Sequence, residues 1–108
     1  FACLESALRL LRANGSRLVV YFAPERSDVP PLVDPSGRPE FARRVRELGV
    51  EIGAAVLDAE NVVPAEYWGW DRDTPDQSHF TERGHRLLAD FIVNGAPEAW
   101  TALARGAP

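Results

Sequence analysis

Hydrophobic positions recur with a helical period at the start of the chain and then run together without a period. Apolar side chains return every three or four positions up to Asn14, and Gly15 follows as a stop signal, which predicts a helix over residues 3–14. Residues 17–23 are almost continuously apolar, with β-branched and aromatic side chains, and end at Pro24. This pattern favours a strand that is covered on both faces, as in a parallel sheet.

A second helix and a second strand follow a proline-rich loop over residues 24–38. Pro39 suits the first turn of a helix, and apolar side chains at three- and four-residue steps before Gly49 predict a helix over residues 39–48. Residues 50–57 favour a second strand.

The last part of the chain predicts a long loop and two helices. Residues 59–80 show no regular period and are expected to form a loop rich in aromatic side chains. Thr81 is a suitable N-cap for a third helix, which Asn94 and Gly95 close, and residues 97–104 favour a short fourth helix. The side chains expected on the buried side of the third helix are Leu87, Leu88, Phe91 and Ile92.

The order helix, strand, helix, strand, helix is typical of an α/β domain with parallel strands and right-handed crossovers. The 108 residues suffice for one domain, over residues 1–108, and not for two. Two parallel strands alone cannot bury both faces, because such sheets have about four to six strands with helices on both sides. Since the chain also contains no methionine, we expect it to be a piece of a longer product, with the rest of the sheet upstream of Phe1 or on another chain.

Composition narrows the class of protein without assigning a function. A hydrophobic fraction of 45% and a charged fraction of 26% are those of an ordinary globular domain. The net charge of -4, with dispersed arginines, gives no electrostatic basis for binding nucleic acid. No apolar run approaches the roughly 18 to 20 residues that span a bilayer, so no membrane contact is evident. Whether the protein is cytoplasmic or extracytoplasmic stays open.

The strongest candidate for chemistry is the pair Asp76 and His79, on the predicted loop just before the third helix. A serine hydroxyl is a weak nucleophile at neutral pH, so it needs a base that takes its proton and a carboxylate that orients and stabilises that base. In open α/β sheets the reactive groups gather beyond the carboxyl ends of the strands, and this loop can return to that edge. The alternative is that Asp76 only turns the loop and that His79 is an exposed loop histidine.

Three further residues are candidates for substrate binding. Trp68 and Trp70, on the predicted loop, could line a pocket for a sugar or an acyl chain, or they could cover the edge of the sheet. Arg26 follows the carboxyl end of the first predicted strand, where it could hold a carboxylate or phosphate group or form a surface salt bridge.

The sequence indicates neither a metal site nor a cofactor. His79, Glu82 and His85 are close in sequence, but a six-residue step along a helix turns two side chains by roughly 240 degrees, to opposing sides. Cys3 has no partner for a disulfide or a metal, and Ser78 lies beside His79 with no oxyanion donors arranged around it. Neither Cys3 nor Ser78 is expected to be a nucleophile.

Residues 76–80 (DQSHF) and 84–89 (GHRLLA) closely resemble the last characteristic sequence block of the SGNH hydrolase superfamily, also called GDSL esterases and lipases. The resemblance extends back to residues 18–23 and to the predicted strand that precedes Asp58. It implies a flavodoxin-like, three-layer αβα sandwich with a parallel sheet, of which this chain is the C-terminal half.

The resemblance also implies roles for the candidate pair and a nucleophile from elsewhere. Asp76 matches the orienting acid of the family and His79 its general base, and both complete a triad with a serine from an early Gly-Asp-Ser block. That block is absent here, as are the oxyanion glycine block and the Gly-x-Asn-Asp block.

These patterns lead to three hypotheses. The first is part of a serine esterase or acyltransferase, which acts through an acyl-serine intermediate on the acyl or acetyl ester of a small molecule or a carbohydrate. Its partner would be the N-terminal half of the same domain. The second is a non-catalytic, hydrolase-like binding or assembly module. The third, a hydrolase completed by a separate chain, predicts an exposed apolar sheet edge beside residues 18–23.

Overall fold

The computed structural model describes residues 1–104 of the chain, and the side chains of residues 1–101. It has a mixed α/β fold with one parallel and one antiparallel pair of strands. Its elements in chain order are α1 (Ala2–Ala13), β1 (Val19–Phe22), the 3-10 turn η1 (Pro35–Gly37), α2 (Arg38–Ile52), β2 (Ala55–Asp58), the 3-10 turn η2 (Ala65–Tyr67), β3 (Trp68–Asp71), β4 (Thr74–Phe80), α3 (Glu82–Gly95) and α4 (Pro97–Ala104).

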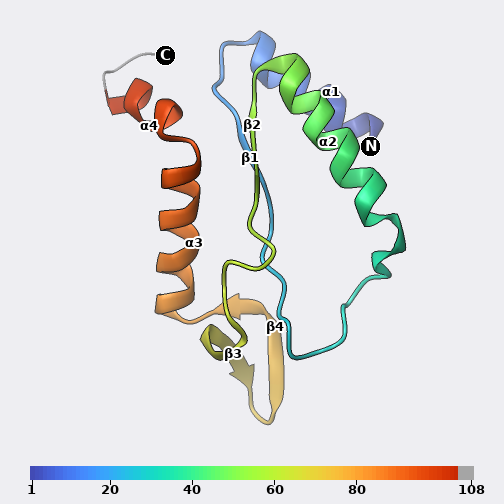
Figure 1. Ribbon diagram of the computed structural model, residues 1–108, viewed down its shortest axis with the longest axis vertical. Helices are drawn as coiled ribbons and strands as arrows, with labels where there is room; N and C mark the ends of the chain where they lie inside the picture. The colour runs from blue at the N-terminus through green and yellow to red at the C-terminus, as the bar shows by residue number, and fades with distance from the viewer. Residues whose placement is uncertain (105–108) are drawn as a thin grey trace.

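The parallel pair lies at the centre of the molecule (Figure 1). β1 and β2 run side by side, from Val19 opposite Ala55 to Phe22 opposite Asp58, and α2 connects them. α1 and α2 lie on one side of the pair and α3 on the other, while the β3–β4 hairpin lies beyond the carboxyl ends of both strands (Figure 1). The predicted α/β arrangement with parallel strands is confirmed for this pair.

A small apolar core holds α1 and α2 against the strands. Phe22, Ala42 and Val45 form its buried centre, and Val45 is only 2% exposed. Gly49 of α2 lies so close to β2 that an added Cβ would stand 2.4 Å from Val56 Cγ2. Because no side chain fits into that distance, glycine at this position allows the helix to pack directly on the strand.

The second helix is longer than predicted and the second strand is shorter. α2 continues through Gly49 to Ile52 and ends at Gly53, whose φ of 73° lies in the left-handed region that favours glycine. Gly49, which resembled a stop signal, has a packing role instead. The predicted strand over residues 50–57 was therefore wrong in its first half, because β2 covers only Ala55–Asp58.

The predicted loop over residues 59–80 was wrong in its second half, where the chain forms the β3–β4 hairpin. Trp68 pairs with Phe80 and Asp71 with Thr74, with a register shift between them. The rings of Trp68 and Phe80 pack edge to face with their centroids 4.6 Å apart. β3 contains a glycine and an aspartate, and β4 contains a proline and an aspartate. These residues have low strand propensity, so the aromatic packing outweighs the local preference of the sequence.

The third helix begins at the predicted place. Thr81 is the N-cap of α3, and its Oγ1 accepts a hydrogen bond from the Gly84 N–H at 3.5 Å. At the other end of the helix, an added Cβ on Gly95 would stand 2.9 Å from Leu57 Cδ1 of β2, so α3 approaches the strand pair there. The predicted short helix over residues 97–104 is confirmed as α4.

Candidate active site

Asp76 and His79 face each other on β4, so their predicted place on a loop was wrong. Asp76 Oδ2 lies 2.8 Å from His79 Nδ1, and Asp76 Oδ1 accepts a hydrogen bond from the Ser78 backbone N–H at 2.7 Å. Residues three apart on a regular strand point to opposite faces. The bond from Ser78 turns the chain locally, as in an Asx turn, and so brings the carboxylate and the imidazole together.

The carboxylate of Asp76 is ionised at neutral pH. The Ser78 N–H, and after it the His79 imidazole, hold the pKa of Asp76 below its usual range. An ionised carboxylate accepts a hydrogen bond from Nδ1–H, and a neutral imidazole that carries its proton on Nδ1 has a bare Nε2 that can accept a proton. The Asp76 side chain is 21% exposed and the His79 side chain 79%, so the imidazole projects outward from a partner that is mostly covered.

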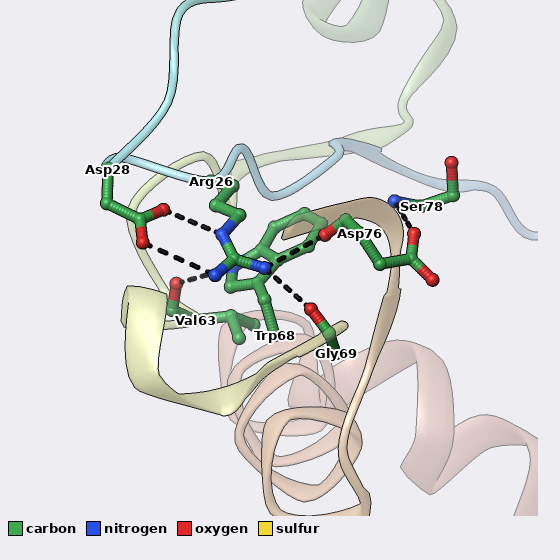
Figure 2. A network of polar contacts seen from close by, with 7 residues as sticks. All are labelled: Arg26, Asp28, Val63, Trp68, Gly69, Asp76 and Ser78. Atoms are coloured by element: carbon green, nitrogen blue, oxygen red, sulfur yellow. Dashed lines mark hydrogen bonds and ion pairs between the residues drawn. The ribbon is translucent and has the colours of Figure 1, made fainter. Parts of the chain in front are cut away.

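The pair lies at the edge where the parallel strands end. Arg26, which follows β1 closely, donates hydrogen bonds from Nη1 to the Gly69 carbonyl of β3 at 2.7 Å and to the Asp76 carbonyl of β4 at 3.1 Å (Figure 2). These two bonds tie the hairpin to the carboxyl end of β1. Ligands of open α/β sheets bind at that end of the strands.

One of the two predicted roles of Arg26 was a surface salt bridge; the salt bridge is present, but its predicted place at the surface was wrong, because the Arg26 side chain is buried. Its side chain is 2% exposed, and the guanidinium forms a two-pronged ion pair with Asp28, in which Nε is 2.7 Å from Oδ1 and Nη2 is 3.3 Å from Oδ2. The guanidinium therefore binds protein acceptors on two sides. A direct contact between Arg26 and a substrate stays a prediction.

The two candidate tryptophans have different surroundings. Trp68 is 3% exposed, and its Nε1 donates a hydrogen bond to the Val63 carbonyl at 3.2 Å, so it belongs to the interior of the hairpin. Trp70 is 62% exposed and lies with Leu32 and His79 along one open depression. Of the two tryptophans, Trp70 is the one that a substrate can contact.

In the part of the chain that the structure describes, no nucleophile faces the imidazole. None of the serine hydroxyls among residues 1–101 forms a hydrogen bond with His79. Ser78 points its hydroxyl away from the Asp76 carboxylate (Figure 2). Cys3 is exposed on α1, which lies at the opposite end of the molecule from the hairpin (Figure 1).

The described residues show neither a metal-binding cluster nor a membrane-spanning helix. Within residues 1–101, no cluster of three or more His, Cys, Asp or Glu side chains is placed to hold a metal ion. Among the helices of residues 1–104, none combines the length and the apolar character that crossing a membrane needs.

Sequence reasoning missed Asp28 and Gly69 as parts of the site. The short spacing from Arg26 to Asp28 was visible, but it does not indicate that the ion pair is buried. Gly69 lies close to Asp76, since an added Cβ on the glycine would stand 3.8 Å from Asp76 Cβ. Its contribution is a main-chain carbonyl, for which the sequence carries no specific signal.

Comparison of the chain with known protein families, with curated proteins and with solved structures finds no match.

Proposed function

We propose that this chain supplies the acid and the base of an SGNH-type serine esterase or acyltransferase, which acts on an acyl or acetyl ester. The observation that carries the proposal is the 2.8 Å contact between Asp76 Oδ2 and His79 Nδ1 near the carboxyl end of β1. An imidazole held through Nδ1 by a carboxylate is the arrangement that activates a serine hydroxyl. The nucleophilic serine comes from outside residues 1–108.

The reaction then proceeds through an acyl-serine in two stages. His79 Nε2 accepts the serine proton while the hydroxyl oxygen attacks the ester carbonyl, and the resulting imidazolium gives that proton to the leaving alcohol. Water or a second alcohol attacks the acyl-serine in the same way and regenerates the free serine. Throughout, Asp76 keeps the imidazole in the Nδ1–H tautomer and stabilises its positive charge.

The proposal includes a larger sheet than the strand pair. A complete SGNH-type domain is a flavodoxin-like, three-layer αβα sandwich, and the partner we propose here is the N-terminal half of that domain. Two observations support this extension. Within residues 1–104, β1 pairs only with β2, and Tyr21 of β1 is 42% exposed. Helices already lie on both sides of the pair, as the outer layers of a sandwich would (Figure 1).

The substrate proposal rests on the depression beside His79. Trp70 and Leu32 are 62% and 74% exposed there, and both lie along the same hollow as the imidazole. An exposed indole and an aliphatic side chain suit an acyl chain or the apolar face of a sugar ring. An acylated carbohydrate or a small acyl ester is therefore the substrate class that we propose.

A second candidate function is a non-catalytic binding or assembly module with a hydrolase-like shell. The observation that favours it is that no serine hydroxyl among residues 1–101 forms a hydrogen bond with His79. The two candidates differ in what lies upstream of Phe1 in the gene. The enzyme requires a glycine-flanked serine after a first strand there, or on a partner chain, whereas the module requires none.

The experiment is ester hydrolysis, for example of p-nitrophenyl acetate, by the chain together with the polypeptide that supplies the serine. His79→Ala is expected to lower turnover by about 10⁴-fold or more, because the base acts as one unit with the nucleophile. His85→Ala is the matched control, since His85 is the other histidine of the chain and contacts Phe80 rather than Asp76. Equal activity of His79→Ala and the parent would overturn the proposed function.

A further inference from the structure

Arg26 is the charged residue that the fold buries, among the side chains that the structure describes. Its side chain is 2% exposed. A buried guanidinium is costly unless its N–H groups find acceptors, and here they do. Nε and Nη2 donate hydrogen bonds to the Asp28 carboxylate, and Nη1 donates to the carbonyls of both Gly69 and Asp76 (Figure 2).

The four bonds join segments that are far apart in the sequence. Arg26 and Asp28 belong to the loop after β1, whereas Gly69 and Asp76 lie 43 and 50 residues further along the chain, on β3 and β4. The planar fork of an arginine suits this geometry, because it presents donors in two directions at fixed angles. A lysine ammonium has the same charge but cannot serve a carboxylate and two carbonyls in this way.

We propose that Arg26 is a positioning residue for the Asp76–His79 pair. By holding the main-chain carbonyl of Asp76, the guanidinium fixes the peptide that leads to Ser78, whose N–H orients the Asp76 carboxylate. The carboxylate in turn holds the imidazole. The catalytic meaning of this role rests on the proposed function, but the positioning itself is a property of the chain.

One further contact of Arg26 and the ionisation of Asp28 fit the same role. The guanidinium carbon lies 5.2 Å from the centroid of the Trp70 ring, so one group holds both the acid of the pair and the exposed indole beside it. The hydrogen bond from Arg26 also holds the pKa of Asp28 below its usual range, so Asp28 stays ionised and the buried charge stays paired at neutral pH.

The test is Arg26→Lys in the 108-residue chain, with the Asp76 carboxyl followed by ¹³C NMR as a function of pH. We expect the pKa of Asp76 to rise toward its usual range and the His79 Nδ1–H resonance to lose its hydrogen-bonded shift, because the carboxylate is no longer oriented. Asp28→Asn keeps Arg26 and weakens only its ion pair with residue 28. It is expected to raise the pKa of Asp76 by less than Arg26→Lys does.

Arg38→Lys is the matched control. Arg38 forms ion pairs with Glu25 and Glu60 near the same end of the strands, and none of its ion pairs reaches the hairpin. This substitution is expected to leave the titration of Asp76 unchanged. If Arg26→Lys does not fold, the titration of Asp76 in Asp28→Asn tests the proposal instead. The proposal would be overturned if folded Arg26→Lys or folded Asp28→Asn titrated at Asp76 like the parent. It would also be overturned if Arg38→Lys changed the titration of Asp76 as much as Arg26→Lys does.

In the protein completed with its serine, Arg26→Lys is expected to lower kcat by about 10- to 100-fold with little change in KM, as for other residues that orient a catalytic group. The two proposals then fail separately. If Arg26→Lys changes the titration of Asp76 while His79→Ala leaves ester turnover intact, positioning stands and the hydrolase function falls. If His79→Ala abolishes turnover while Arg26→Lys leaves the titration of Asp76 unchanged, the hydrolase function stands and the positioning role falls.

Discussion

Two regions of this chain are held together in different ways. The α1–β1–α2–β2 unit packs around apolar side chains, with Val45 2% exposed and Phe22 8% exposed at its centre. The β3–β4 hairpin relies on one aromatic pair and on the buried guanidinium of Arg26. The candidate site lies on the hairpin, so its geometry depends on a few specific contacts rather than on a broad apolar interface.

The largest expected effect is in the hairpin, where Trp68→Ala removes the main aromatic contact. We expect a loss of about 4 kcal/mol in the free energy of unfolding, which is typical of a buried tryptophan. Trp70→Ala, a substitution of the same type at a side chain that is 62% exposed, should change it by less than about 0.5 kcal/mol.

Urea unfolding measures both values, and hydrogen exchange locates the change. In Trp68→Ala the amides of β3 and β4 are expected to lose protection while those of α2 keep theirs. Equal losses for the two tryptophan variants, or loss of protection in α2 first, would show that the hairpin has no separate dependence on its aromatic pair.

In the apolar unit the corresponding change is Val45→Ala, for which we expect a loss of about 2 kcal/mol, since it leaves a cavity in the core. Val50→Ala is the control, because Val50 lies on the same helix and is 86% exposed. The Asp76–His79 contact, followed by NMR, should be unchanged in both variants. A core substitution that disrupts this contact without unfolding the chain would contradict the separation of the two regions.

Thr81 lies at the junction between the hairpin and α3, and a smaller effect is expected there. Thr81→Ala removes the N-cap hydroxyl and should cost about 1 kcal/mol of stability. Thr81→Ser keeps the hydroxyl and should recover most of that loss. Thermal unfolding compares the three chains, and a serine variant as unstable as the alanine variant would argue against capping as the cause.

The smallest effect concerns pH. Because the pKa of Asp76 is lowered in the folded chain, its contribution to stability is present above the usual pKa of an aspartate and is lost as the pH falls through the folded value. The difference in unfolding free energy between neutral pH and about pH 3 should therefore be smaller in Asp76→Asn than in the parent. Asp90→Asn removes an equal charge from an exposed position of α3 and serves as the control. If the unfolding free energy of Asp76→Asn depended on pH as that of the parent does, the lowered pKa of Asp76 in the folded chain would be contradicted.

Much of the apolar unit was predictable from sequence, because burial on one face imposes a period on a helix. The prediction missed the end of α2, where Gly49 is required by contact with Val56 rather than by a turn. Packing distance between two elements is a tertiary property, and a single glycine in the sequence does not distinguish it from a stop signal.

The hairpin was not predictable in the same way. Its strands contain glycine, proline and aspartate, and its pairing depends on the contact of Trp68 with Phe80. The spacing of Asp76 and His79 predicted that they would lie together, and the 2.8 Å contact confirms this, while their catalytic role stays a prediction. The burial of Arg26 stayed hidden, because it is created by carbonyls 43 and 50 residues away.

The tautomer of His79 shows whether the Asp76 carboxylate orients the imidazole as a general base. ¹⁵N NMR of the histidine-labelled chain, at a pH where the imidazole is neutral, reports which ring nitrogen carries the proton. We expect a proton on Nδ1, bonded to Asp76, and a bare Nε2, with this preference lost in Asp76→Asn. A proton on Nε2, or a tautomer ratio that Asp76→Asn leaves unchanged, would contradict this expectation.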